Sequence, residues 1–214
     1  MSIGLSRVKA AVLAALIAVA ALLALTQGCG GSGKEGGEQA FRQAQQDLKE
    51  AGESEVRPEE RGPVTLKLYF LDDTGGTPFL RAEERTVPYT QAVARAALEE
   101  LFKGPSAGSG LTAVFPNTVR VLDVSVTDGI CTVSVSKEII TDKAASGGAG
   151  AMVESLALAS IANTLTEFPT VSKVKLLVEG KQSGVVDGRH IEDFWGHVGL
   201  PEYLERDMSV VGPR

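Results

Sequence analysis

The sequence contains few of the residues from which catalytic and metal sites are usually built. Its 214 residues include two cysteines, two histidines and one tryptophan, and aromatic residues make up only 5% of the chain. Two cysteines do not supply a disulfide framework or a cysteine-based metal site. The scarcity of histidine and of aromatic rings leaves little material for catalysis or for stacking against sugars.

Positive charge is also in short supply. The chain carries 21 Lys and Arg residues against 27 Asp and Glu residues, a net charge of −6. Removing residues 1–28 takes away Arg7 and Lys9 and no acid, which leaves 19 basic against 27 acidic residues and a net charge of −8. Phosphate backbones and anionic lipid surfaces repel such a protein, so nucleic acid is not an expected partner.

The N-terminus has the pattern of an export signal. Arg7 and Lys9 precede a chargeless apolar run from Ala10 to Leu25. This run is short for a membrane-spanning helix of ~20 residues and typical of a signal peptide. Residues 1–28 are therefore predicted to be a signal peptide. The alternative is an uncleaved anchor helix, and in both cases the rest of the chain lies outside the cytoplasm.

The residues at the end of the apolar run resemble a bacterial lipobox. They read Leu-Thr-Gln-Gly-Cys, with the small residue Gly28 immediately before Cys29. The resemblance implies that the Cys29 thiol carries diacylglycerol and that the chain is cleaved before this residue. The expected location is the extracytoplasmic side of the cell membrane, with the lipid on Cys29 as the membrane contact.

Two other patterns suggest a cofactor or a metal, and both fail on their chemistry. Gly28 to Lys34 spells most of a phosphate-binding loop, but Glu35 stands where Ser or Thr would ligate magnesium, and no apolar helix follows. A group of possible ligands in the C-terminal tail has the spacing of neither HExxH nor a facial triad. No cofactor, metal or catalytic residue is therefore predicted. The tail group consists of His190, Glu192, Asp193 and His197.

After the signal peptide the chain divides into a tether and one domain. Residues 29–62 are rich in Gly, Glu and Gln, with a possible short helix over Glu38–Glu50. A flexible chain of this length has an end-to-end distance of roughly 30 Å, enough to hold a domain off the membrane. Residues 63–214 form the folded region, which ends in a tail of weak periodicity from Lys181 onward.

The folded region alternates strand and helix patterns in the order β-α-β-β-α-β. The strand VTLKLYFL begins at Val64, helices are predicted within YTQAVARAALEELFKGP and MVESLALASIANTLTEFP, and VSKVKLLVEG contains the last strand. This order predicts an α+β fold: a two-layer sandwich of one mixed sheet with both helices on one face, plus the tail. A ferredoxin-like strand order is expected.

The clearest local signal is the pair Asp128-Gly129, which favours a two-residue type I′ hairpin. A turn at this position places six apolar side chains on one face, and a slip of one residue would expose all of them. Cys131 is therefore predicted to be a small core residue. The expected facing pairs are Val126 with Cys131, Val124 with Val133, and Leu122 with Val135.

The sheet face away from the helices is predicted to carry one tyrosine and three lysines. If the first and last strands of the sandwich lie in one sheet, these side chains share that face. They either are simply solvated or bind a partner. The four residues are Lys67, Tyr69, Lys173 and Lys175.

Five segments of the folded region, taken together, are typical of one known family. In chain order they are KLYFLDD, ALEELFKGP, FPNTVRVLDVSVTDGICTVSVSKEI, ASIANTLTEFPTVSKVKLLVEG and GHVGLPEYLERDMSV. From about Val64 to Val211 the chain thus resembles the GerMN domain, the sporulation and spore germination family of endospore-forming bacteria. The resemblance implies a non-enzymatic lipoprotein that acts as an assembly or interaction module.

The same resemblance implies envelope or sporulation proteins as partners, together with self-association. A second class of function stays open, a lipoprotein that binds a cell-wall fragment or a small solute. Such a module needs a concave apolar pocket with a few convergent polar groups. A small sandwich filled by Leu and Val is expected to leave little room for one.

Overall fold

The computed structural model describes residues 42, 43, 45, 46, 62–142 and 150–212. By the density of its internal contacts, the chain divides into two compact units, residues 1–57 and 58–214. In the first unit the four described residues are helical and lie within the expected helix Glu38–Glu50. The predicted signal peptide, Cys29 and most of the tether lie outside the described residues.

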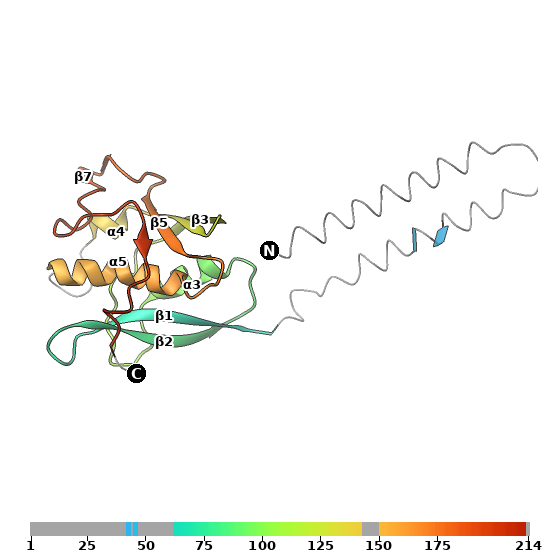
Figure 1. The fold of residues 1–214 in the computed structure, drawn as a ribbon, viewed down its shortest axis with the longest axis horizontal. Helices are drawn as coiled ribbons and strands as arrows, with labels where there is room; N and C mark the ends of the chain where they lie inside the picture. The colour runs from blue at the N-terminus through green and yellow to red at the C-terminus, as the bar shows by residue number, and fades with distance from the viewer. Residues whose placement is uncertain (1–41, 44, 47–61, 143–149, 213–214) are drawn as a thin grey trace, which may run out of the picture. The chain divides into compact units, whose positions relative to one another are not determined.

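The second unit is an α+β domain with two main β-sheets (Figure 1). In the first sheet β1 (Val64–Asp72) pairs antiparallel with β2 (Phe79–Val87). The second sheet has the order β3-β4-β5-β8, formed by β3 (Val121–Thr127), β4 (Ile130–Val135), β5 (Lys173–Val178) and β8 (Leu204–Glu205). A short hairpin consists of β6 (Val185–Val186) and β7 (Arg189–His190). The helices of this unit are α3 (Val93–Lys103), α4 (Glu138–Thr141) and α5 (Ala151–Leu165).

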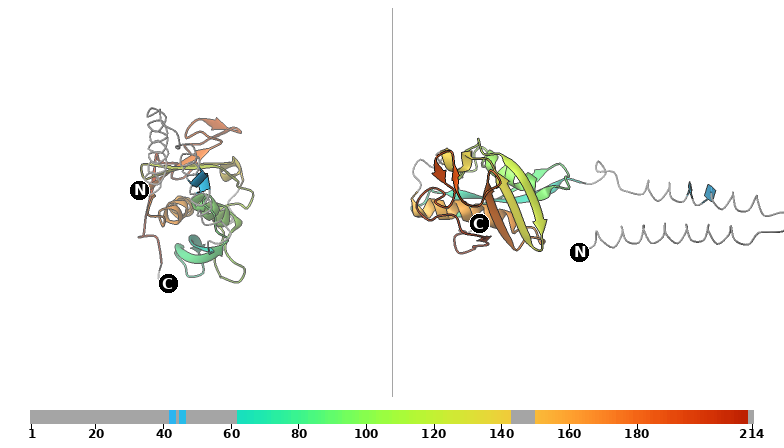
Figure 2. Two further views of the ribbon diagram at one scale, coloured as in Figure 1. Left: turned by 90° about the vertical axis from the view of Figure 1, so that its right-hand side faces the viewer. Right: turned by 90° about the horizontal axis from the view of Figure 1, so that it is seen from above.

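Helices α3 and α5 lie between the two sheets, as Figures 1 and 2 show. α3 packs on β1 and β3, whereas α5 packs on β1, β5 and β8. α5 is buried over most of its length, from Leu156 to Leu165. A helix that is buried on most of its circumference needs cover on every side. The domain therefore has three layers, with the helices in the middle.

The α+β class and the mixed sheet are confirmed, since β4 runs antiparallel to β3 and parallel to β5. The prediction of one sheet in a two-layer sandwich with ferredoxin-like strand order is wrong. β1 pairs with β2, in a sheet separate from that of β3, β4, β5 and β8. The sequence pattern also missed β2. Most side chains of β2 are polar or charged, and only Leu80 is fully buried, so this strand has little of the alternation by which strands are recognised.

The edge of β1 that faces away from β2 is covered by helix α5. The hydroxyl of Ser160 donates to the backbone carbonyl of Tyr69 (2.6 Å), and the hydroxyl of Thr164 accepts from the backbone N–H of the same residue (3.2 Å). Ser160 and Thr164 are four residues apart and therefore lie on one face of the helix. Unpaired edge groups of a strand favour aggregation, and α5 protects this edge with its own side chains.

The predicted hairpin is present between β3 and β4. Asp128 and Gly129 have φ values of 50° and 80°, as a type I′ turn requires. The pairs Val126–Cys131 and Val124–Val133 are confirmed. The third pair is wrong, because a register shift places Val121 opposite Val135 and leaves Leu122 43% exposed. Cys131 is a buried core residue, and burial raises the pKa of its thiol to about 11.

Replacement of Gly129 by valine is expected to lower the free energy of unfolding by about 1–3 kcal/mol. A β-branched residue resists the positive φ of this position, and a Cβ here would lie 2.9 Å from the hydroxyl oxygen of Ser172. Urea melts measure the loss. Gly62→Val is the matched control, since no atom lies within 4 Å of a Cβ at Gly62. A loss below about 0.5 kcal/mol would contradict the strain argument.

The C-terminal tail connects the two sheets across helix α5 (Figure 1). On one side β8 pairs antiparallel with β5. Asn163 of α5 then donates to the carbonyl of Asp207 and accepts from its N–H, both at 2.8 Å. On the other side the Val210 carbonyl accepts from the N–H of Leu80, and Gly212 donates back to the carbonyl of Leu80. The tail is thus a third cover for α5, in addition to the two sheets.

Candidate functional site: a groove between helix α5 and the C-terminal tail

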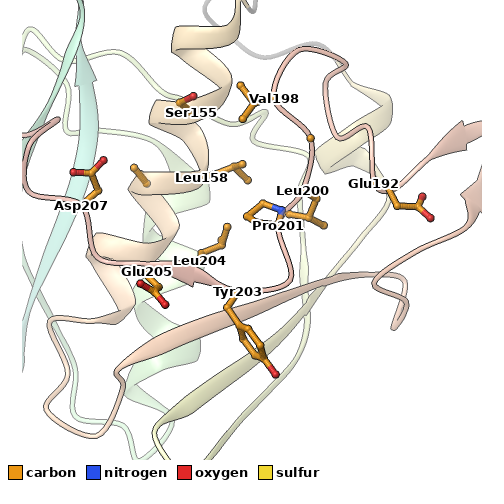
Figure 3. Close-up of a pocket in the computed structure, with 12 residues that line it drawn as sticks. Ser155, Leu158, Glu192, Val198, Leu200, Pro201, Tyr203, Leu204, Glu205 and Asp207 are labelled. Atoms are coloured by element: carbon orange, nitrogen blue, oxygen red, sulfur yellow. The ribbon is translucent and has the colours of Figure 1, made fainter.

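A groove of about 550 Å³ lies between α5 and the tail (Figure 3). Leu158 of α5 and Leu204 of β8 are nearly fully buried and form its floor. Leu200 and Pro201, on the loop that precedes β8, form one wall. The groove exists because the tail crosses α5 at two points and leaves the helix surface between them only partly covered.

One wall of the groove is held by a buried carboxylate. Glu154 lies in the first turn of α5 and is fully buried. Its carboxylate accepts three backbone N–H groups of the tail, from Trp195 (3.3 Å), His197 (2.8 Å) and Gly199 (3.1 Å). Hydrogen bonds to a charged acceptor are roughly twice as strong as neutral ones, and the helix N-terminus also favours a negative charge. Glu154 therefore fixes the loop that forms this wall.

Trp195 holds the same loop from the other side. Its indole N–H donates to the carbonyl of Ile139 in the short helix α4 (2.8 Å). Its ring stacks on Phe194 with a centroid distance of 4.9 Å and meets Phe115 at 6.0 Å. A buried aromatic cluster of this kind contributes both apolar burial and specific ring geometry. The loop that forms the groove wall is thus attached both to Glu154 of α5 and to Ile139 of α4.

The margin of the groove is acidic. In Figure 3 the carboxylates of Glu192, Glu205 and Asp207 lie around an apolar centre, and no Lys or Arg is among the residues that line the groove. Glu192 accepts the N–H of Gly184 (2.9 Å), and hydrogen bonds from its own N–H and from that of Gly184 lower its pKa. The margin therefore presents negative charge at neutral pH.

A second hollow of about 780 Å³ adjoins the groove at Ser155, which lines both. It lies between the start of β2, the first turns of α5 and the end of the tail, and its lining is mostly apolar. Three large apolar side chains that are 47–51% exposed are located around the two hollows. These residues are Met152 in the second hollow, Val198 in the groove, and Met208, which lines neither hollow but follows Asp207 of the groove and precedes Ser209 of the second hollow.

The structure does not bring the four predicted face residues together. Lys67 and Tyr69 are on β1, whereas Lys173 and Lys175 are on β5 of the other sheet. The prediction of a shared exposed face is wrong, because α5 covers β1 and Tyr69 is fully buried. Lys173 lies over the ring of Tyr203, with its Nζ 4.0 Å from the ring centroid. Cys29, the predicted lipidation site, lies outside the described residues.

Tyr69 and Lys67 instead belong to a partly exposed cluster around Glu167. The Glu167 carboxylate accepts the hydroxyl of Tyr69 (2.6 Å) and pairs with Lys67 (3.2 Å) and with Arg206 of the tail. Burial raises the pKa of Glu167, but hydrogen bonds from Tyr69, Arg206 and Lys67 outweigh it and hold the pKa below its usual value. This cluster ties β1, the end of α5 and the tail together.

The candidate ligands of the tail do not form a metal site. Within residues 62–142 and 150–212, no group of three His, Cys, Asp or Glu side chains is arranged to hold a metal ion. His197 contributes its backbone N–H to Glu154, and Glu192 binds the backbone of Gly184.

In the part of the chain that the structure describes, no helix is both long and apolar enough to cross a membrane.

Sequence reasoning missed Glu154 and the groove that it supports. The available signal was Glu154, the one charged residue in a helix whose other residues are apolar or small and polar. Glutamate is rarely fully buried unless it is paired, so such a residue indicates a buried partner. The partners are backbone N–H groups in a stretch of weak periodicity, and these have no side-chain signature in the sequence.

Comparison with known proteins identifies the family to which the domain belongs. The sequence model for sporulation and spore germination matches residues 67–184. The chain therefore belongs to this family, as its sequence segments predicted. The match ends before the groove-forming part of the tail. A comparison with curated proteins found no match.

One solved structure shows the same fold, and two further ones are similar to parts of the chain. The first GerMN domain of the sporulation protein GerM from Bacillus subtilis is 24% identical, with a TM-score of 0.50, and the match covers 67% of this chain and 98% of that domain. The tandem GerMN domains of the same protein match at 24% identity and a TM-score of 0.49, and this chain spans only 47% of their length. A Clostridium perfringens protein described as a candidate lipoprotein matches at 24% identity and a TM-score of 0.39, covering 67% of this chain and 93% of that chain.

Proposed function

We propose that this chain is a lipid-anchored extracytoplasmic protein that acts in spore formation or germination by binding other proteins and not by catalysis. Membership of the sporulation and spore germination family supports the process. The observation that carries the binding role is the groove beside α5, with exposed apolar side chains around it. Exposed apolar patches with a polar margin mark interaction sites.

A lipid anchor strengthens binding at such a surface by keeping the domain close to other membrane-bound proteins. A module tethered to the membrane meets neighbours on the same surface at a high effective concentration, so a weak contact suffices for assembly. In-cell cross-linking of the full chain during sporulation tests this role. Discrete complexes with other envelope proteins are expected. A chain that stays uncross-linked, or a purified chain that turns over a substrate, would overturn the proposal.

Lipidation of Cys29 is a separate expected outcome. The intact mass of the protein extracted from membranes should correspond to a chain that begins at Cys29 and carries acyl groups. Cys29→Ala should abolish the acyl mass and release the chain from the membrane fraction. Cys131→Ala is the matched control and should leave the anchor unchanged, because Cys131 is buried in the core. An unmodified N-terminus at Met1 would contradict lipidation.

A ligand-binding role is the second candidate, and the size of the groove favours it. A volume of about 550 Å³ falls within the range of roughly 300–1,000 Å³ that is usual for small-molecule sites. The acidic margin selects against anionic wall fragments. A thermal-shift series with soluble wall fragments and cationic solutes separates this candidate from protein binding.

A further inference from the structure

We infer that the groove and the adjoining hollow bind a basic amphipathic segment of a partner protein. This inference rests on the proposed binding function and names the chemistry of the partner. Apolar side chains of the segment enter the two hollows, and its Lys or Arg side chains meet the acidic margin. The two hollows and the three exposed apolar residues Met152, Val198 and Met208 are called the α5 track below.

The shape of the track suits an elongated ligand with more than one anchor. The groove and the second hollow, about 550 and 780 Å³, both include Ser155 in their lining, so they adjoin each other along α5. A compact solute would fill only one of them. Amphipathic segments that lie in apolar grooves present several apolar anchors along one face, and the two hollows offer a place for more than one of them.

The lining of the track is adaptable where it is exposed and firm where it is buried. Met152 and Met208 have flexible, polarisable side chains of a kind that is common at peptide-binding surfaces. Leu158 and Leu204, which line the groove, are packed in the core. Glu154 holds the loop that carries Val198 through three backbone hydrogen bonds. A wall that is already ordered loses little conformational entropy on binding.

Charge decides which partner the track accepts. Glu192, Glu205 and Asp207 line the groove, and none of the residues that line either hollow is Lys or Arg. Rim charges of one sign steer ligands of the opposite sign and repel those of the same sign. A cationic amphipathic segment therefore complements both the apolar centre and the margin.

The same argument disfavours two other occupants. The chain's own tether, residues 29–62, contains eight acidic and five basic residues, so it is repelled by the margin. A second copy of the mature chain carries a net charge of −8. Neither complements an acidic groove. The expected occupant is therefore a basic segment of a different protein.

Peptide binding to the full chain tests this inference. The protein is placed in neutral phosphatidylcholine nanodiscs, with empty nanodiscs as the blank, and is titrated into a fluorescent Leu/Lys amphipathic peptide. The Leu/Glu peptide of the same pattern is the comparison. Saturable binding of the Leu/Lys peptide alone is expected in anisotropy measurements. No saturable binding, or equal binding of both peptides, overturns the inference.

Two variants and two matched controls assign the binding to the track. Glu205→Lys is expected to weaken binding about 10-fold and Val198→Ser about 5-fold. Glu84→Lys makes the same charge change on β2, and Val185→Ser the same apolar change on β6; each should alter affinity less than about 2-fold. Thermal melts confirm that all four variants fold. Equal losses in variants and controls would show nonspecific charge attraction and overturn the inference.

The peptide-binding test of the track and the cross-linking test of the proposed function can fail independently of each other. Cross-linked complexes in cells without peptide binding at the track would retain the binding role and reject this surface. Peptide binding without complexes in cells would reject the binding role in the native host.

Discussion

Replacement of Glu154 by alanine is expected to lower the free energy of unfolding by about 3 kcal/mol and to release the tail loop from α5. The carboxylate is fully buried and accepts the N–H groups of Trp195, His197 and Gly199. Its removal leaves three donors without an acceptor, and each buried donor that loses its partner costs about 1–3 kcal/mol. The expected loss for the three donors together stays near the lower end of this range, because the loop can move outward and its N–H groups can then bind water.

Urea melts and amide hydrogen exchange measure this effect. Exchange should accelerate at residues 195–199, whereas residues 130–135 of β4 should stay protected until global unfolding. Glu205→Ala is the matched control, since Glu205 is an exposed acid on the same tail, and it should cost less than about 0.5 kcal/mol. If Glu154→Ala costs no more than this control, the carboxylate does not hold the groove wall.

Replacement of Tyr69 by alanine is expected to be equally severe, with a loss of about 3–5 kcal/mol in the free energy of unfolding. The ring is fully buried between β1 and α5, and its removal leaves a cavity and an unsatisfied Glu167. Tyr69→Phe keeps the packing and should cost only about 1 kcal/mol. Lys175→Ala, on the outer side of β5, is the control and should cost less than about 0.5 kcal/mol.

The pH dependence of Tyr69→Phe gives an independent measurement. The pKa of Glu167 is lowered in the folded protein, so its contribution to stability is present above the unfolded pKa and is lost as the pH falls. The hydroxyl of Tyr69 is one of the hydrogen bonds that produce this lowering. The phenylalanine variant should therefore lose less stability than the wild type on acidification. An unchanged pH profile in urea melts would exclude this role for the hydroxyl.

Both predictions bear on how the domain presents its groove. Glu154 holds one wall, and the Glu167 cluster holds Arg206 at the end of β8. The tail between these points carries Leu200, Pro201 and Leu204. Weakening either attachment is expected to reduce peptide affinity at the α5 track, because a mobile wall must be ordered on binding.

The sequence alone determined the local features of this domain. The turn at Asp128-Gly129 followed from backbone sterics, and the burial of Cys131 followed from the alternation of the strands around it. These features depend on residues within a few positions of one another. Helix α5 was visible as an apolar stretch ended by Pro169 for the same reason. The five segments that resemble the family also lie within these regular elements.

Only the tertiary structure decided where those elements go and where the groove lies. The pattern of β1 was read as half-buried, but packing against both α3 and α5 buries residues on both of its faces and moves Tyr69 from an expected partner surface into the core. β2 is mostly polar because it lies at the edge of a two-stranded sheet and has few apolar contacts to make. The tail has strands of two residues, too short for any periodicity, and Glu154 holds it through backbone N–H groups. Backbone donors are present at every residue except proline, so no side-chain pattern reveals which of them a distant carboxylate binds.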